Sequence, residues 1–207
     1  MTLALLFHDS DIIIVDKNAD LLSVPGRGPD KLDSVFHRLT LQFDEVHIVH
    51  RLDMATSGIM VFARHKNALR HLQQQFQHRQ TEKSYQAILA GRLTPSSGAI
   101  NLPMRCDWPN RPQQIVCYDF GKKSLTRWRV MEYLDQTTRV ELMPVTGRSH
   151  QLRVHCNALG HPILGDNLYG TTESQAATKH LCLHAQSLTF THPSSGERLT
   201  FTSPSPF

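Results

Sequence analysis

The feature that most restricts how this chain can fold is a succession of short apolar runs separated by turn residues. Ile12 to Val15 and Ile59 to Ala63 are two such runs, and each is too short to span a bilayer. Runs of this length, bounded by Gly, Pro, Asn or Asp, are typical of buried strands. Further strands are expected at 84–90, 98–102, 124–133, 137–143, 186–191 and 198–202.

A few stretches between these runs favour helices, at about 34–43, 68–80 and 150–159. Asp33 or Ser34 is the expected cap of the first helix, Asn67 is the expected cap of the second, and Gly160 ends the third. Because strands outnumber helices and do not alternate with them regularly, the sequence predicts an α+β protein with a mixed, mostly antiparallel sheet.

Composition leaves the class of partner open. Against 18 Asp and Glu there are 22 Lys and Arg, and the resulting charge of +4 is common both in proteins that contact polyanions and in proteins that do not. The four cysteines form no Cys-x-x-Cys pair, and no basic segment followed by a long apolar stretch begins the chain. These features predict reduced thiols and a cytoplasmic location.

Asp53 lies at the junction of two apolar runs, between Val49 and Ile59. A carboxylate between buried strands is costly unless a structural partner or a function holds it there. One interpretation is a turn residue that caps the amides of Ala55 or Thr56. The other is an ionised carboxylate held at a cleft by a cation, and the sequence around Asp53 leaves both open.

A suitable cation could come from the segment at 146–155, TGRSHQLRVH, which follows a strand and opens a helix. Arg148, His150 and Arg153 belong to this basic segment, which is a candidate for contacts with phosphates. An exposed residue at a helix start is the alternative for Arg148. Tyr85 begins a strand and is typical of a sheet-face aromatic, but a ring facing a cleft could stack on a base.

Metal and cofactor motifs have little support in the sequence. His180, Cys182 and His184 would share one face of an extended strand, but no second ligand cluster follows at a recognised spacing. We therefore expect no metal site. The sequence also has no Walker loop, no Gly-x-Gly-x-x-Gly and no Gly-x-Ser-x-Gly, so no nucleotide cofactor is expected.

Three segments taken together resemble one family. Residues 50–58, HRLDMATSG, resemble the His-Arg-Leu-Asp-x-x-Thr-Ser-Gly signature of RluA-family pseudouridine synthases. The segments at 144–155 and 160–170 resemble the family's Thr-Gly-Arg-x-His-Gln-[Ile/Leu]-Arg-x-His and Gly-His-Pro-Ile-x-Gly-Asp-x-x-Tyr-Gly runs. The order and spacing of the matches, which extend over about residues 12 to 202, argue against chance agreement.

The resemblance implies the pseudouridine synthase catalytic fold, with a central sheet in two lobes, flanking helices and a catalytic cleft. It implies one catalytic domain over residues 1–207, without a separate N-terminal RNA-binding domain. The segments at 22–26 and 106–112 resemble the short branch of the family, which acts on 23S rRNA and tRNA anticodon stem-loops. RNA is therefore the implied partner, and a monomer that makes no membrane contact is expected.

The resemblance also implies roles in the reaction. That reaction breaks the N1–C1′ bond, turns the uracil and joins C5 to C1′, on a base that has left its stack. Asp53 is implied to be the catalytic carboxylate, either as a nucleophile or as a base that removes a ribose proton. Arg148 is implied to be its ion-pair partner, which favours the charged carboxylate. Tyr85 is implied to stack on the uracil.

The remaining implied contacts are with RNA, through Arg51, His150 and Arg153, with Lys83 as a further candidate. A nucleoside or glycoside hydrolase is an alternative, but it usually needs a second acid or a metal, and Asp166 is a weak candidate for the acid. A non-catalytic RNA-binding module is another alternative.

One departure from the family is visible near the first strand. The family usually has Lys-Pro-x-Gly, whereas this chain has KNAD at 17–20. We expect a changed local turn rather than a changed reaction.

Overall fold

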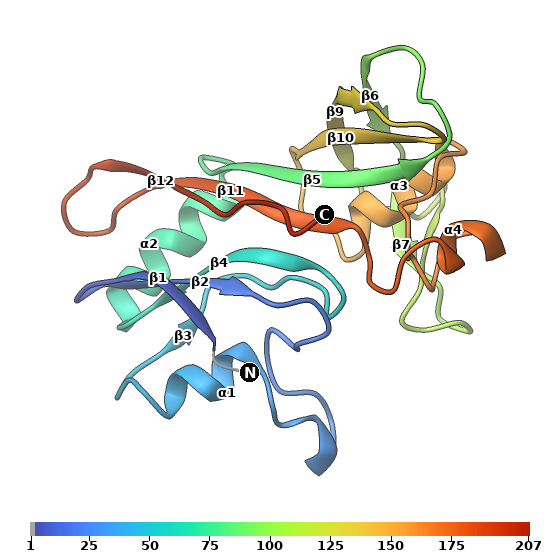
Figure 1. The fold of residues 1–207 in the computed structure, drawn as a ribbon. Helices are drawn as coiled ribbons and strands as arrows, with labels where there is room; N and C mark the ends of the chain where they lie inside the picture. Colours follow the sequence, from blue (N-terminus) through green and yellow to red (C-terminus); the bar gives the residue numbers. More distant parts are fainter. Residues whose placement is uncertain (1–2) are drawn as a thin grey trace. The chain divides into compact units, whose positions relative to one another are not determined.

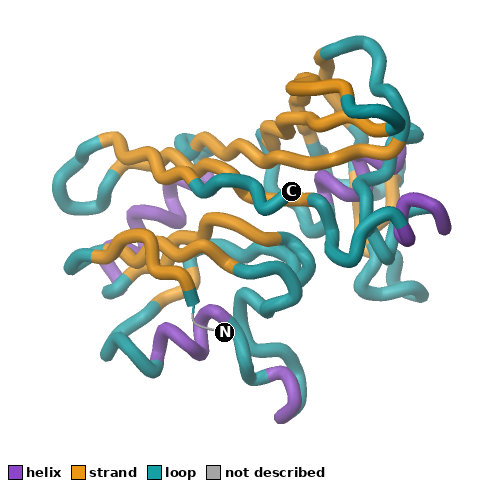
Figure 2. Tube along the Cα trace, in the orientation of Figure 1, coloured by secondary structure: helices purple, strands orange, loops and turns teal. Residues whose placement is uncertain are grey.

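The computed structural model describes residues 3–207, which divide into two compact units. The first unit comprises the chain up to Lys83 together with His184–Pro206, and the second comprises Ser84–Leu183 with Phe207. Figure 1 shows the path of the chain, and Figure 2 shows that strands form much of both units. The chain leaves the first unit once, completes the second, and returns to add its last strands to the first.

The first unit is built on a mixed sheet. Its elements are β1 (Ala4–His8), β2 (Ile12–Lys17), η1 (Pro29–Lys31), α1 (Val35–Thr40), β3 (His47–Ile48), β4 (Ser57–Ala63), α2 (Lys66–Gln77), β11 (Leu183–Thr191) and β12 (Arg198–Thr202). β2 pairs antiparallel with β1 and β4, and β3 also pairs antiparallel with β4. β4 and β11 run parallel, and β12 lies antiparallel to β11.

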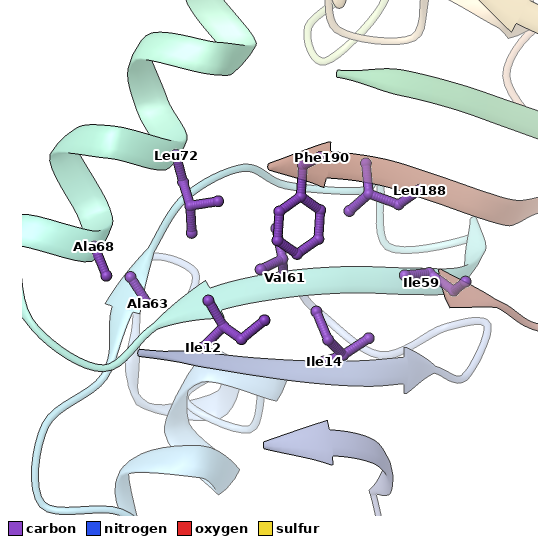
Figure 3. Packing of buried hydrophobic residues seen from close by; sticks show 9 residues of the cluster. All are labelled: Ile12, Ile14, Ile59, Val61, Ala63, Ala68, Leu72, Leu188 and Phe190. Carbon is purple, nitrogen blue, oxygen red and sulfur yellow. The ribbon is translucent and has the colours of Figure 1, made fainter. Parts of the chain in front are cut away.

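One face of this sheet buries an apolar cluster against α2 (Figure 3). Alternate residues of a strand point to the same side, so β2 and β4 each contribute every second side chain to it. The cluster consists of Ile12, Ile14, Ile59, Val61, Ala63, Ala68, Leu72, Leu188 and Phe190. Burying a large apolar side chain contributes about 1.5–3 kcal/mol. This cluster therefore fixes β4, whose first residue directly follows the loop that carries Asp53.

The second unit has an antiparallel sheet. Its elements are β5 (Glu82–Ala90), β6 (Ser97–Asn101), β7 (Met104–Cys106), β8 (Gln114–Val116), β9 (Leu125–Tyr133), β10 (Thr137–Pro144), α3 (Gln151–Ala158) and α4 (Thr172–Ala176). β10 pairs with both β5 and β9, and β9 pairs with β6. β7 and β8 form a separate short hairpin. The expected α+β class with a mostly antiparallel, mixed sheet arrangement is confirmed.

Several local predictions need correction. The cap of α2 is His65, whose ring accepts a hydrogen bond from the Ala68 amide, and not Asn67, which lies inside the helix. Ser34 caps α1 as one of the two expected residues, by accepting from the His37 amide. The strand predicted before Asp53 is short, since β3 contains only His47 and Ile48. β1, β7 and β8 are absent from the expected strands: β1 has an apolar run at 4–7 but is exposed along its length, and the other two have three residues each.

Candidate active-site segments

Asp53 lies in the connection at 49–56 between β3 and β4. Ile48 pairs antiparallel with Phe62, so the connection starts beside the far end of β4 and runs back to the first residue of that strand, Ser57. Asp53 is half-buried and Arg51 is exposed, and the Asp53 carbonyl accepts a hydrogen bond from the Thr56 amide at 3.1 Å. The loop therefore ends in a hydrogen-bonded turn that leads directly into the buried strand β4.

Ser23 fixes the backbone immediately before Asp53. Its hydroxyl donates to the Leu52 carbonyl at 2.6 Å and accepts from the Leu52 amide at 3.1 Å. Both the hydroxyl and Leu52 are buried, so each backbone group finds its partner away from water. One side chain thus sets the orientation of the peptide groups on both sides of Leu52.

Lys17 fixes the backbone immediately after Asp53. Its fully buried ammonium donates to the carbonyls of Met54 and Leu21, each at 2.8 Å, and of Asn18 at 2.9 Å. Burial lowers the pKa of Lys17 to about 7, while the carboxylates of Asp20 and Asp53 oppose this change. A neutral amine has only two N–H groups, so the three carbonyl acceptors favour the ammonium form. The positive charge of Lys17 attracts the Asp53 carboxylate.

The turn at 17–20 places Asp20 in a conformation that glycine adopts most readily. Its backbone is left-handed, with φ of 63°. Asp is one of the few residues other than glycine that adopt this conformation readily. The turn that returns the chain toward Leu21 and Lys17 is therefore compatible with the KNAD sequence at 17–20.

His50, the first residue of the motif at 50–58, packs against α2. Its ring stacks on Phe76 with centroids 4.9 Å apart, and its Nε2 accepts from the Val61 amide at 3.1 Å. Burial, with the nearby Lys83 ammonium, lowers the pKa of His50 to about 3. His50 is therefore neutral near pH 7 and ties the start of the loop to β4 and α2. Lys83 also lies over the Phe76 ring, 6.0 Å from its centroid.

The end of the motif packs tightly against β11. A Cβ added to Gly58, whose φ is 112°, would lie 2.3 Å from the Ala185 carbonyl oxygen. Beside it, the Ser57 hydroxyl is 2.9 Å from Nδ1 of His184. Nε2 of His184 lies 3.2 Å from the Ser203 carbonyl, so Nε2 carries the proton and Nδ1 accepts. Burial lowers the pKa of His184, which keeps the ring neutral in this network.

In the second unit, Gln151 shapes the turn that presents Arg148. Its buried side-chain oxygen accepts from the Thr146 hydroxyl at 2.7 Å and from the Arg148 amide at 3.0 Å. Its amide group donates to the Leu125 carbonyl at 3.1 Å, at the start of β9. Arg148 itself is exposed, and its Nε donates to the Lys123 carbonyl at 3.4 Å. The exposed guanidinium is thus carried on a turn that the sheet supports.

His150 follows in a left-handed conformation, with φ of 54°. The Tyr169 hydroxyl lies 2.7 Å from Nδ1 of His150 and accepts from the Gln114 amide at 2.8 Å. The donor in the Tyr169–His150 pair depends on the tautomer of His150, because a hydroxyl that accepts from Gln114 can accept a second hydrogen bond or donate its own proton. This chain of hydrogen bonds joins the start of α3 to β8.

Arg153 is buried, unlike the exposed Arg148 of the same segment. Its side chain is 3% exposed and forms two hydrogen bonds with the fully buried carboxylate of Asp166, at 2.9 and 2.6 Å. The same carboxylate accepts from the amides of Leu168 and Tyr169. These contacts give Arg153 and Asp166 a structural role, which weakens Asp166 as a second catalytic acid. An RNA contact by Arg153 stays a prediction.

Tyr85 lies in β5, half-buried and opposite Leu142 of β10. β10 ends at Pro144, and the turn that carries Arg148 follows it. Tyr85 therefore lies on the strand next to the one that leads into this turn. The structure therefore groups Arg51 with Asp53 in the first unit, and Tyr85 with Arg148 and His150 in the second. Sequence analysis did not identify Ser23 or Lys17 as residues that hold the Asp53 loop.

Among residues 3–207, one further group has the spacing of metal ligands: Asp9, Asp11 and His192. Asp9 already accepts from His192 at 2.9 Å, and Asp11 accepts from Ser194 and from His65. A metal would have to displace these hydrogen bonds, so we assign none. No helix within 3–207 combines the length and apolarity needed to cross a membrane.

Comparison with known proteins identifies the relatives of these segments. The model of the RNA pseudouridylate synthase family matches residues 11–158. The dual-specificity RNA pseudouridine synthase RluA of Escherichia coli K12 is 50% identical over 206 residues, which cover 99% of this chain and 94% of that protein. The Haemophilus influenzae protein of the same name is 48% identical over 206 residues, with the same coverage of both chains.

A solved structure supports the same grouping. Human RNA Pseudouridylate Synthase Domain Containing 1 has a TM-score of 0.84 and 31% sequence identity. The similarity covers 100% of this chain and 84% of the human one.

Proposed function

This chain belongs to the RNA pseudouridylate synthase family and is an isomerase that makes pseudouridine in RNA, and we propose that Asp53 is the carboxylate that carries the reaction. The observation that supports this assignment is the way the loop is held. Ser23 fixes the backbone before Asp53, and Lys17 fixes the backbone after it. Preorganisation of this kind is what a reacting group requires, because misplacement by a fraction of an ångström lowers the rate.

The proposed reaction is an isomerisation, so atoms balance without a co-reactant. The N1–C1′ bond breaks, the uracil turns, C5 bonds to C1′, and the proton lost from C5 is matched by one gained at N1. Asp53 acts either by covalent attack or by removing a ribose proton. Tyr85 and Arg148 have, as part of this proposal, the roles that the family resemblance implies: a stacking aromatic and a counter-charge.

The proposed substrates are uridines in loops of 23S rRNA and of tRNA anticodon stem-loops. Two relatives carry the word "dual-specificity" in their names, which supports more than one RNA substrate. Loop bases are already partly unstacked, so their extrusion costs less than that of a paired base. Arg51 is exposed two residues before Asp53, and His150 is half-buried at the start of α3, and both are proposed to contact this RNA.

The proposed working form is a cytoplasmic monomer whose two units make one catalytic domain. All four cysteines are free, as expected in a reducing compartment. Neither a metal nor a nucleotide cofactor enters the proposed reaction.

Release of tritium from RNA that contains [5-³H]uridine tests the proposal, since C5 loses its hydrogen when pseudouridine forms. Asp53→Asn preserves size but removes the charge, and it should abolish release in a single turnover. Asp44→Asn, at an exposed position in the same unit, is the matched control and should retain the wild-type rate. Wild-type release by Asp53→Asn would overturn the assignment. A non-catalytic RNA-binding module would give no release with any variant.

A further inference from the structure

Three aromatic side chains of the second unit are unusually exposed, and no role has been assigned to them above. Trp108 is 63% exposed, Tyr118 74% and Phe120 83%. We call these three residues the aromatic surface. A single exposed apolar side chain is ordinary on a folded protein, so it is the gathering of three large aromatic side chains about one short hairpin that points to binding. All three lie on or beside the β7–β8 hairpin.

The hairpin presents these side chains at its two ends. Trp108 lies in the loop at 107–113 that joins β7 to β8, whereas Tyr118 and Phe120 lie in the turn that follows β8. Cys106 pairs with Gln114 at the first end, and Met104 pairs with Val116 at the other. Three residues of strand span about 10 Å. The two ends are therefore far enough apart to contact different nucleotides of one strand.

The Trp108 loop is ordered by its own hydrogen bonds. The Asp107 amide donates to the Gln113 carbonyl at 3.0 Å, and the Asn110 side-chain amide donates to the Asp107 carboxylate at 2.9 Å. The Arg111 guanidinium lies over the Trp108 ring, 4.3 Å from its centroid. A loop that is already ordered loses less entropy on binding, which makes it a better docking element.

The charged residues around the aromatic surface indicate which class of molecule it binds. Residues 105–123 contain four basic side chains, which are Arg105, Arg111, Lys122 and Lys123, against two carboxylates, which are Asp107 and Asp119. The four basic side chains are all exposed, and the Asp107 carboxylate has a hydrogen bond inside the loop. Exposed aromatics interleaved with cations suit single-stranded nucleic acid, because bases stack on the rings while cations neutralise phosphates.

Contacts within the second unit connect the aromatic surface to the Arg148 segment. At one end of β8, the Gln114 amide donates to Tyr169, which in turn hydrogen-bonds His150. Beyond the other end, the Lys123 carbonyl accepts from Arg148. The hairpin thus lies directly beside the two residues that are proposed to act on RNA.

We propose that the aromatic surface binds the unpaired nucleotides that flank the target uridine, by stacking their bases on Trp108 and on Phe120 or Tyr118. The proposal rests on the proposed function and deepens it, because it explains how a looped RNA is distinguished from a duplex. A duplex keeps its bases stacked on one another and offers only phosphates to this surface.

Tryptophan fluorescence provides the test. The chain has two tryptophans, and Trp128 is 5% exposed, so quenching by RNA reports on Trp108. A stem-loop RNA should quench this emission, and a duplex with the same stem sequence should quench it much less. Measured by filter binding to the stem-loop, Trp108→Ala and Phe120→Ala should each raise Kd by about five- to 150-fold. Trp108→Phe should retain most of the affinity. In all three variants, kcat at saturating RNA should stay near the wild-type value.

Leu41→Ala is the matched control, because Leu41 is 75% exposed and lies in the first unit. It should leave Kd unchanged. Equal Kd values for wild type, Trp108→Ala and Phe120→Ala would overturn the inference while leaving the proposed function intact if Asp53→Asn is still inactive. Conversely, weaker binding by the aromatic variants together with an active Asp53→Asn would overturn only the proposed role of Asp53. Sedimentation that shows a wild-type dimer and a Trp108→Ala monomer would assign the surface to self-association and overturn the inference.

Discussion

Replacing Asp166 by Asn should destabilise the second unit by about 3–5 kcal/mol, the usual cost of removing one member of a buried ion pair. Asp166 is fully buried, Arg153 is 3% exposed, and two hydrogen bonds of 2.9 and 2.6 Å join them. An asparagine keeps an oxygen that accepts from the amides of Leu168 and Tyr169, but it removes the negative charge. The expected loss therefore comes mainly from a buried guanidinium whose counter-charge has gone.

Both tryptophans lie in the second unit, so tryptophan fluorescence in urea follows the unfolding of that unit. The free energy of unfolding of a small unit falls by about 1–2 kcal/mol per molar urea. The Asp166→Asn substitution should then lower the midpoint by about 1.5–5 M. If the loss of stability is larger, the second unit will already be unfolded in the absence of urea.

Two controls separate the buried charge from a general effect of the substitution. Glu132→Gln removes a carboxylate from an exposed pair with Arg139 in the same unit, and its midpoint should change far less. The double variant Arg153→Met, Asp166→Asn leaves no buried charge at this site and should recover most of the lost stability. A midpoint for Asp166→Asn within a few tenths molar of wild type would refute the reasoning. So would a double variant that is less stable than Asp166→Asn alone.

Three further predictions concern the first unit. Gly58→Ala should lower the free energy of unfolding by more than about 2 kcal/mol, because its Cβ would lie 2.3 Å from the Ala185 carbonyl oxygen. Ser23→Ala should lower the free energy of unfolding by about 1–3 kcal/mol and reduce kcat more than it changes KM, because two buried backbone groups of Leu52 lose their partner. The pKa of His184 is lowered by burial, so the unfolded chain takes up a proton near pH 6.5 before the folded one does. His184 alone should therefore lower stability by at most about 1.4 kcal/mol per pH unit as pH decreases below 6.5, and the fall should be less steep by up to this amount in His184→Gln.

Matched variants make these predictions decisive. Gly196→Ala also places alanine at a positive φ, of 72°, but nothing lies within 4 Å of its Cβ, so it should lose only the cost of backbone strain. Equal losses for Gly58→Ala and Gly196→Ala would contradict the packing argument. Ser195→Ala, at an exposed position in the first unit, should be neutral, and an unchanged kcat in Ser23→Ala would contradict a positioning role. Identical pH slopes for wild type and His184→Gln would show that His184 does not titrate in this range.

The sequence predicts most of the fold because the strands and helices carry a local signal. The Ile12 and Ile59 runs are apolar and bounded by turns, and they form β2 and β4. β1 carries the same kind of signal, since 4–7 is an apolar run that ends at His8, but its side chains are exposed rather than buried. His65 is not among the usual helix caps, and its capping role depends on a backbone geometry that its residue type does not indicate.

The residues of the candidate site also fall into two groups, those that the sequence indicates and those that only the fold reveals. Asp53 and Arg148 can be selected from the sequence through the family motifs that contain them, because the residue pattern alone leaves a turn cap and an exposed helix-start residue as alternatives. Ser23 cannot be selected, since its hydrogen bonds reach 29 residues along the chain. Lys17 resembles any surface lysine until its three carbonyl partners are known. Arg153 resembles its exposed neighbour Arg148 in sequence, and only the fold shows that it is buried.

Mapping of pseudouridines in total RNA tests the central claim most directly. Cells that lack this protein should lose pseudouridine at specific sites in 23S rRNA and tRNA. Wild type and Asp44→Asn, supplied to these cells, should restore the sites, whereas Asp53→Asn at equal abundance should not. Restoration by Asp53→Asn, or an RNA pattern that does not change when the protein is absent, would contradict the account.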